Sequence, residues 1–111
     1  MAIRGRYIVG VDNGSQSTKV VIYDLEGNAV AEGRQVLRAA NRPRPGVVEH
    51  PVDDLWDSIV RASQQALANF LGDPREIIGI GLCTIRCCKA FLRADGTLAQ
   101  PVMSWMDTRA Y

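Results

Sequence analysis

Two short apolar runs separated by a polar loop constrain the fold of this chain more than any other feature. Residues 7–12 (YIVGVD) and 18–24 (TKVVIYD) are each long enough for one strand, and residues 13–17 supply turn-forming side chains between them. The tetrapeptide LEGN at 25–28 predicts a second turn, after which residues 29–37 can return as a third strand. The chain is therefore expected to begin as a three-stranded antiparallel meander.

A proline-rich stretch and an amphipathic helix follow the meander. Residues 41–51 hold three of the five prolines, which lack the backbone donor that a sheet interior needs, so an extended surface connection is expected there. Asp53 is a suitable helix N-cap, and Gly72 with Pro74 is expected to end the helix. The residues expected to form its buried face recur at three- and four-residue spacing: Trp56, Ile59, Val60, Ser63, Ala66, Leu67, Phe70 and Leu71.

Residues 77–84 (IIGIGLCT) form a nearly continuous apolar run soon after this helix. Such a run indicates a buried strand, and its arrival from a helix favours parallel pairing beside the meander. Residues 89–93 and 97–99 flank Ala-Asp-Gly at 94–96, which predicts a further hairpin. The predicted fold class is α/β: a mixed sheet with an antiparallel three-stranded meander followed by a helix and a parallel strand, in one domain of 111 residues.

Charge and cysteine content limit the expected partners. Thirteen Lys and Arg against twelve Asp and Glu give a formal net charge of +1, so neither nucleic acid nor a membrane is expected. The first apolar run ends at Asp12 and is too short for a secretory signal or a membrane span, so we expect a cytoplasmic protein. Three cysteines without a CxxC pair (Cys83, Cys87, Cys88) and one distant histidine, His50, predict free buried thiols rather than structural zinc.

The loop between the first two strands combines the groups that a phosphate site uses. Residues 12–19 (DNGSQSTK) join a carboxylate, a glycine, three hydroxyls and a cation. Glycine lets the backbone approach phosphate oxygens, N–H and hydroxyl groups donate to them, and a strand-end carboxylate can hold magnesium through its waters. A plain tight hairpin prefers the same residue types, so this loop alone favours neither interpretation. No GxxxxGK[ST] motif occurs, so it is not a Walker A loop.

Two further constellations could contact a small ligand. Trp105 offers an apolar face to the C–H side of a sugar, and Asp107 with Arg109 can hydrogen-bond hydroxyls from one rim. The competing structural interpretation is a core Trp beside a surface ion pair. Arg86 and Cys87 follow the last predicted strand, where open α/β sheets commonly border ligand crevices, although Arg86 could equally serve a structural carboxylate.

Taken in order, these motifs resemble the start of the FGGY family of carbohydrate kinases. The resemblance is carried by IVGVDNGSQSTKVVIYDLEGN at 8–28, PGVVEHP at 45–51, IGIGLCTIR at 78–86 and PVMSWMDTR at 101–109. Their order and approximate spacing match the family over about residues 7–109. The resemblance implies an actin-like ATPase, ribonuclease H-like fold. It identifies residues 1–111 as the N-terminal part of domain I of such a kinase, with the second, C-terminal domain absent from this chain.

The resemblance also implies a reaction, ATP-dependent phosphorylation of a hydroxyl of a small sugar or polyol, with ATP and Mg²⁺ as cofactors. It places Asp12 at the magnesium ion. It lines the phosphate loop with Gly14, Ser15, Ser17, Thr18 and Lys19. The general base and the adenosine pocket belong to the missing domain, so no catalytic base is expected here and the isolated chain is expected to be inactive.

On the substrate side the resemblance implies two groups of residues. Trp105, Asp107 and Arg109 match the family's WxDxR signature beside the sugar site, and Arg86 matches an arginine that contacts substrate in glycerol kinases. Cys87 stands where glycerol kinases have a glutamate that holds the polyol. The histidine that xylulose kinases place nearby is also missing, so both substrates are disfavoured.

The alternative interpretation is a non-catalytic nucleotide-binding module of the same fold, either a truncated kinase relative or an actin-like or Hsp70-like switch. The DNGSxxxK loop is similar to actin's, whereas a switch has no reason to carry the WMDTR cluster at 105–109. The expected partner is a small sugar or polyol, with no nucleic acid and no membrane. The particular sugar stays open, as does a homodimer of the complete protein.

Overall fold

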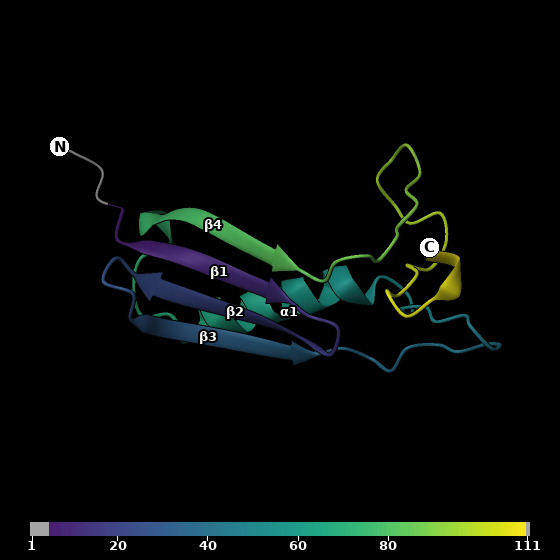
Figure 1. Ribbon diagram of the computed structural model, residues 1–111. Coiled ribbons are helices and arrows are strands. Elements are labelled where there is room, and N and C mark those ends of the chain that lie inside the picture. Colours follow the sequence, from purple (N-terminus) through teal and green to yellow (C-terminus); the bar gives the residue numbers. More distant parts are fainter. Residues whose placement is uncertain (1–4, 111) are drawn as a thin grey trace.

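The computed structural model describes residues 5–110, which form a four-stranded mixed sheet with one long helix packed against it (Figure 1). The strands are β1 (Tyr7–Asn13), β2 (Ser17–Asp24), β3 (Ala29–Val36) and β4 (Ile77–Thr84), in the spatial order β3-β2-β1-β4. β2 is antiparallel to both of its neighbours, and β4 is parallel to β1. The predicted meander, helix and parallel strand are therefore confirmed.

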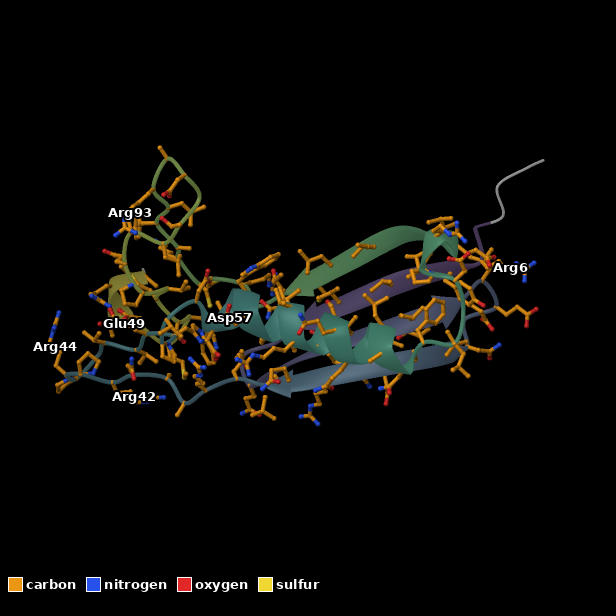
Figure 2. The ribbon with its side chains drawn as sticks, turned by 180° about the vertical axis from the view of Figure 1, so that it is seen from behind. Arg6, Arg42, Arg44, Glu49, Asp57 and Arg93 are labelled. Atoms are coloured by element: carbon orange, nitrogen blue, oxygen red, sulfur yellow. The ribbon has the colours of Figure 1, made fainter. Side chains whose placement is uncertain are left out.

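Helix α1 (Asp54–Asn69) covers one face of the sheet, mainly over β2 and β3, as the view from behind in Figure 2 shows. Alternate residues of the strands meet the helix, and the core consists of Val11, Val20, Ile22, Ala31, Ala62 and Ala66. Full burial of one Val or Ile side chain stabilises a fold by about 1.5–3 kcal/mol. β2 supplies Val20 and Ile22, each 1% exposed, so it is the central strand of this core.

The buried face of α1 differs from the predicted one. Trp56 is 59% exposed, Leu67 is 46% exposed, and Leu71 lies beyond the helix and is fully exposed. Of the predicted face, Ala66 is buried, and Ile59 and Phe70 pack partly buried against the core. The buried residues of the helix are small or polar: Asp54, Ser58, Ala62 and Ala66.

Close approach of helix and sheet explains this choice of face. A Cβ added to Gly33 on β3 would lie 2.1 Å from the Ala62 carbonyl oxygen and 2.7 Å from the Ala66 amide nitrogen. Backbones this close leave no room for Leu or Trp between them, so small residues turn inward. Hydropathy alone ranks these positions below the larger apolar ones and thus selects the wrong face.

The ends of α1 agree with the prediction only in part. Asp53 occupies the N-cap position as predicted, but its side chain makes no capping hydrogen bond. The helix ends at Asn69, before the predicted Gly72, because Phe70 takes an extended conformation (φ −80°, ψ 124°). A short 3₁₀ turn, η1 (Pro74–Glu76), then leads into β4.

Segments far apart in sequence pair irregularly beyond one end of the sheet. The 47–50 segment runs beside 102–104, where the His50 N–H donates to the Val102 carbonyl at 2.9 Å. Lys89 pairs with Met103 from the other side. Residues 47, 48 and 50 are buried, so the expected surface connection is wrong at this point. These isolated pairings join segments far apart in sequence, and the turn-forming residues of the sequence do not predict them.

The predicted hairpin at 89–99 forms as a narrow loop without regular strands. It closes at the bridge between Leu92 and Leu98, and Gly96 at its tip has a φ of 87°, a left-handed conformation that suits glycine. Figure 1 shows this loop and the C-terminal segment beyond the carboxyl ends of β1 and β4. The turn prediction is therefore right in position, but the strands around it are absent.

Strand β4 forms an exposed edge of the described sheet. Ile78, Ile80 and Leu82 are 59%, 73% and 64% exposed because α1 packs mainly over β3 and β2 and leaves β4 largely uncovered. Within residues 5–110 the expected burial of this strand is therefore wrong. The thiols are free as predicted, but Cys83 and Cys87 are exposed rather than buried. None of the helices in the described range is long and apolar enough to cross a membrane.

Candidate functional site

The first hairpin loop (residues 12–19) presents a carboxylate at the carboxyl end of β1. Asp12 stands opposite Lys19 on β2 and beside Cys83 on β4. Strand alternation turns Asp12 and Lys19 to the open face, the side of the sheet that α1 leaves uncovered, and both are exposed. Within the described residues the Asp12 carboxylate makes no hydrogen bond or ion pair, so its oxygens are available to a ligand.

The tip of this loop is held by backbone hydrogen bonds. The Gly14 N–H donates to the Ser17 carbonyl at 3.0 Å, and the Leu37 N–H donates to the Gln16 carbonyl at 2.9 Å. Ser15 is exposed and Ser17 is half-buried. The loop therefore has an ordered backbone with two hydroxyls near its outer surface.

A groove of about 500 Å³ runs along this end of the sheet. Its walls are Asp12, Ser17, Lys19, Glu32, Gly33, Arg34 and Gln65. The Lys19 Nζ lies 3.8 Å from a carboxylate oxygen of Glu32, and both side chains are more than half exposed. Exposed pairs of this kind contribute little, so Lys19 remains free to turn toward an anion.

Arg34 and Gln65 are groove residues that the sequence analysis missed. Arg34 pairs directly with Lys19 in the β2–β3 register, so its side chain shares the open face. Strand alternation on β3 could have identified Arg34, because the turn at 25–28 sets the register in which Arg34 shares a face with Lys19. Gln65 comes from α1, and its Oε1 accepts a hydrogen bond from the Arg34 N–H at 3.0 Å.

Thr18 points to the opposite side of the sheet from the groove. Its hydroxyl is completely buried, accepts a hydrogen bond from Asn13 Nδ2 at 2.6 Å, and lies 2.6 Å from the Ser58 hydroxyl. Ser58 in turn donates to the Leu55 carbonyl at 2.8 Å. The phosphate-lining position predicted for Thr18 is thus not where its side chain lies, and the threonine fastens the loop to α1 instead.

The segment after β4 leaves the sheet beside the first hairpin loop. The Ile85 N–H donates to the Asn13 carbonyl at 3.0 Å, and the exposed Arg86 and Cys87 follow. Cys87 has a φ of 66°, in the left-handed region that residues with a side chain rarely adopt. Strained conformations of this kind cluster at functional sites.

The C-terminal cluster consists of Glu49, Asp107, Arg109 and the Val48 backbone. Asp107 and Arg109 belong to the WxDxR motif. The Asp107 Oδ1 accepts hydrogen bonds from the Arg109 N–H at 2.8 Å and from its Nε at 3.0 Å. The Oδ2 accepts from the Arg109 Nη2 at 2.8 Å and from the Val48 N–H at 2.8 Å. Arg109 Nη2 also lies 2.9 Å from Glu49 Oε2. The cluster thus links two segments about sixty residues apart in sequence.

Electrostatics in the C-terminal cluster favour the charged pair. The Arg109 guanidinium hydrogen bonds hold the pKa of Asp107 well below its usual range, against the opposing effect of burial. The pKa of Arg109 is raised, first by Asp107 and then by Glu49. Asp107 is completely buried and both of its oxygens already accept two protein donors, so it faces no ligand directly in this arrangement.

The other predicted substrate residues lie nearer the surface. Trp105 is 42% exposed, and its backbone hydrogen-bonds the thiol of Cys88. Burial raises the pKa of that half-buried thiol. The Arg109 side chain is 36% exposed. Figure 1 shows the C-terminal segment at the same end of the molecule as the first hairpin loop, so the fold gathers both sets of predicted residues at one end.

Comparison with known proteins identifies the family. Residues 7–111 match the model of the N-terminal domain of the FGGY family of carbohydrate kinases. The chain belongs to this family. The resemblance drawn from the sequence motifs is thereby confirmed.

Individual relatives of this FGGY domain agree with that assignment. The chain is 53% identical over 104 residues to YgcE, an uncharacterized sugar kinase of Escherichia coli (strain K12). The aligned residues cover 94% of this chain and 21% of YgcE. A ligand-bound xylulose kinase from Lactobacillus acidophilus is similar in structure, with a TM-score of 0.78, 25% identity, and coverage of 91% of the chain and 20% of that protein.

A third relative supports the fold alone. The structure of Plasmodium falciparum glycerol kinase with ADP has a TM-score of 0.72 and 24% identity, over 93% of this chain and 21% of the other. The actin-like ATPase fold predicted for the FGGY domain is therefore confirmed. The chain spans about a fifth of the length of these relatives.

Proposed function

We propose that this chain is the N-terminal part of a kinase that transfers the γ-phosphate of ATP to a hydroxyl of a small sugar or polyol. The observation that carries the proposal is Asp12, an unpartnered carboxylate within the described residues, at the end of β1 in an FGGY-family domain. Lys19 stands directly opposite on β2 and adds positive charge beside it. A cytoplasmic location belongs to the same proposal.

The residues of the first hairpin loop fit a magnesium ion that arrives with ATP. Mg²⁺ prefers oxygen ligands, keeps several waters and is commonly bound through one or two carboxylates plus the phosphates of the substrate. Asp12 offers one such carboxylate on an open surface. The described residues contain no group of three or more His, Cys, Asp or Glu that could enclose a metal. Asp12 would hold the ion, which would neutralise charge on the phosphates.

The remaining groups of the loop suit the phosphate oxygens. Gly14 permits close approach of the backbone, and the hydroxyls of Ser15 and Ser17 can donate from the outer side of the loop. Lys19 is held only by an exposed pair with Glu32 and can turn to the phosphates. Phosphoryl transfer depends mainly on positioning and on stabilisation of charge, which these groups supply.

On the sugar side, some residues are proposed to contact the acceptor and one to orient a contacting residue. Arg86, Cys87 and Trp105 are exposed and can meet an acceptor, and Arg109 is partly exposed. Asp107 is buried against Arg109, so its part is to orient the guanidinium. None of these groups is proposed as the general base, which belongs to the second domain.

The rest of the kinase would complete this domain and its site. The chain spans about a fifth of its relatives, and strand β4 leaves Ile80 and Leu82 exposed beside an unpaired edge of the described sheet. An apolar edge of this kind favours further covering structure in a longer protein. The isolated 111-residue chain is accordingly proposed to be inactive.

The test is ADP production from Mg-ATP by the longest protein that the gene encodes, over a panel of pentoses, ketoses, sugar acids and polyols. We expect one acceptor or a small related group to raise ADP formation well above the rate without acceptor. Release of ADP without any acceptor serves as the background control. No increase in ADP formation with any acceptor of the panel, with Mg-ATP binding preserved, would overturn the proposal in favour of the non-catalytic nucleotide-binding module.

A further inference from the structure

We propose that Ser58 on helix α1 is a positioning residue for the first hairpin loop, acting through Thr18 and Asn13. The inference rests on the proposed function, because it assigns the loop a phosphate ligand. Ser58 lies on the opposite side of the sheet from Asp12 and Lys19 and touches no part of the groove. Its effect would therefore be indirect, through the conformation of the loop.

The hydrogen bonds of this relay have one consistent direction. Ser58 donates its single hydroxyl proton to the Leu55 carbonyl at 2.8 Å, so its oxygen must accept from Thr18 at 2.6 Å. With the Thr18 proton used in this way, the Thr18 oxygen accepts from Asn13 Nδ2 at 2.6 Å. Each hydroxyl proton thus has one acceptor, and the relay ends on the carbonyl of the first turn of α1.

The relay lies in a dry interface between sheet and helix. Thr18 is 0% exposed, Ser58 is 1% exposed and Asn13 is 5% exposed. Val11, Val20 and other apolar core residues surround the contact between the strands and the helix. A buried polar group that loses its partner in such a place costs the full desolvation penalty, so the hydroxyl of Ser58 has a strong influence on its neighbours.

Asn13 and Thr18 mark the two ends of the loop tip. They pair directly across β1 and β2, and the four residues between them include the hydroxyls of Ser15 and Ser17. Asp12 precedes Asn13 and Lys19 follows Thr18, each turned to the open face. Fixing Asn13 and Thr18 to α1 therefore sets where the carboxylate, the ammonium group and the loop backbone lie relative to one another.

Asn13 also contacts the start of the proposed sugar side, but through its backbone. The Asn13 carbonyl accepts a hydrogen bond from the Ile85 N–H, directly before Arg86. That contact uses the backbone of Asn13, whereas the relay uses its side chain. A variant that breaks only the relay should therefore disturb Mg-ATP binding while leaving the acceptor contacts in place.

The expected loss of Mg-ATP affinity follows from the fraction of molecules in which the loop is competent to bind. Loss of a buried partner shifts such an equilibrium by roughly tenfold, and the apparent affinity falls in proportion to the competent fraction, so a tenfold loss of affinity is the upper limit. Ser58→Ala should therefore weaken Mg-ATP binding by up to about tenfold, as should Thr18→Val, which keeps the shape of the side chain and removes its hydroxyl. The double variant should be little worse than either single one, because both break the same relay.

The experiment uses the longest protein that the gene encodes and a matched control on the same helix. Ser63 is half-buried and its hydroxyl makes no hydrogen bond within residues 5–110, so Ser63→Ala removes a hydroxyl without breaking the relay. Three quantities are measured for each variant: hydrogen exchange of residues 13–19, the dissociation constant of Mg-ATP, and the KM of the acceptor. Exchange and Mg-ATP binding need no turnover, so they report on the relay even if no acceptor is found.

We expect faster exchange of residues 13–19 and weaker Mg-ATP binding in Ser58→Ala and Thr18→Val, with an unchanged acceptor KM and no effect of Ser63→Ala. Loop exchange that is the same in Ser58→Ala and Ser63→Ala would overturn the positioning role. So would faster exchange with unaltered Mg-ATP affinity, or an equal rise in acceptor KM, because either would indicate a purely structural contact. Absence of ADP formation in the unmodified protein would contradict the proposed function but not the relay.

Discussion

The first hairpin loop and the C-terminal cluster use the same types of charged group in opposite ways. Asp12 and Lys19 face the open side of the sheet, and within the described residues Asp12 has no partner. Asp107 and Arg109 bind each other, and the carboxylate is completely buried with all its acceptor positions used. An acid and a base close in sequence therefore indicate a ligand site only after the hydrogen bonds of the acid have been accounted for.

The two regions also differ in how their geometry is held. A regular strand register positions the first hairpin loop, so each side chain on the open face follows from alternation. Within residues 5–110 the C-terminal cluster lies outside the four strands and α1, and it depends on side-chain contacts across long stretches of chain, such as the bond between Asp107 and the Val48 N–H. We therefore expect substitutions in the loop to change activity, and those in the cluster to change stability first.

The largest expected effect is at Asp12. Asp12→Asn keeps the size of the side chain and removes the charge proposed to hold magnesium, so sugar-dependent ADP formation should fall by about 10²–10³-fold. Stability should be unchanged, because the carboxylate is exposed and has no partner in the described residues. Glu26→Gln, at the exposed turn between β2 and β3, is the matched control. Near-normal turnover of Asp12→Asn in a steady-state assay would contradict the magnesium role.

Asp107→Asn should give the opposite result. The amide keeps an acceptor for the Val48 N–H but leaves Glu49 as the one remaining charged partner of the Arg109 guanidinium within the described residues, so the thermal midpoint should fall by about 5–10 °C. Asp53→Asn, at an exposed aspartate without a capping bond, is the control and should leave the midpoint unchanged. A variant that loses activity at an unaltered midpoint in differential scanning calorimetry would mean that Asp107 acts on the ligand itself.

A smaller effect is expected at Lys19. Lys19→Met removes the ammonium group opposite Asp12, and the KM for Mg-ATP should rise roughly tenfold, the low end for a hydrogen bond to a charged group. The difference from the unmodified protein should shrink as salt is added, because the charge is exposed and screened. Lys89→Met, on an exposed side chain of the irregular region, is the control. A salt-independent difference would argue against direct attraction of phosphate.

The smallest expected effect concerns His50 and pH. Burial lowers the pKa of His50 below its ordinary value of 6.5, with partial opposition from Asp54. As the pH falls, the unfolded chain therefore binds the proton before the folded chain does. The stability that the neutral histidine contributes is fully present above pH 6.5 and declines as the pH falls below that value. The thermal midpoint should drop by about 1–2 °C between pH 7.5 and 5.5, and His50→Gln should lack this component. An identical pH dependence in both proteins would remove His50 as its cause.

The sequence predicted the site best where the signals are local. Alternation and turn residues located the loop of Asp12 and Lys19, and the motif order identified the family. The same reasoning missed Ser58, because its place on the buried face of α1 follows from the close approach at Gly33 rather than from hydropathy. It also placed Thr18 in the phosphate loop, since sequence spacing does not show which side of a strand end meets a helix.

The sequence by itself determined the meander, the helix and the apolar run of the parallel strand, because each depends on patterns within one or two dozen neighbouring residues. It also determined the family, through the order of motifs along the chain. Tertiary structure alone decided which polar groups are exposed and which are used within the fold. The bond between Thr18 and Ser58 spans 40 residues, and that between Val48 and Asp107 spans 59. Contacts at such separation arise only when the sheet, the helix and the C-terminal segment have packed, and packing is what uses one carboxylate as a structural partner and leaves the other exposed.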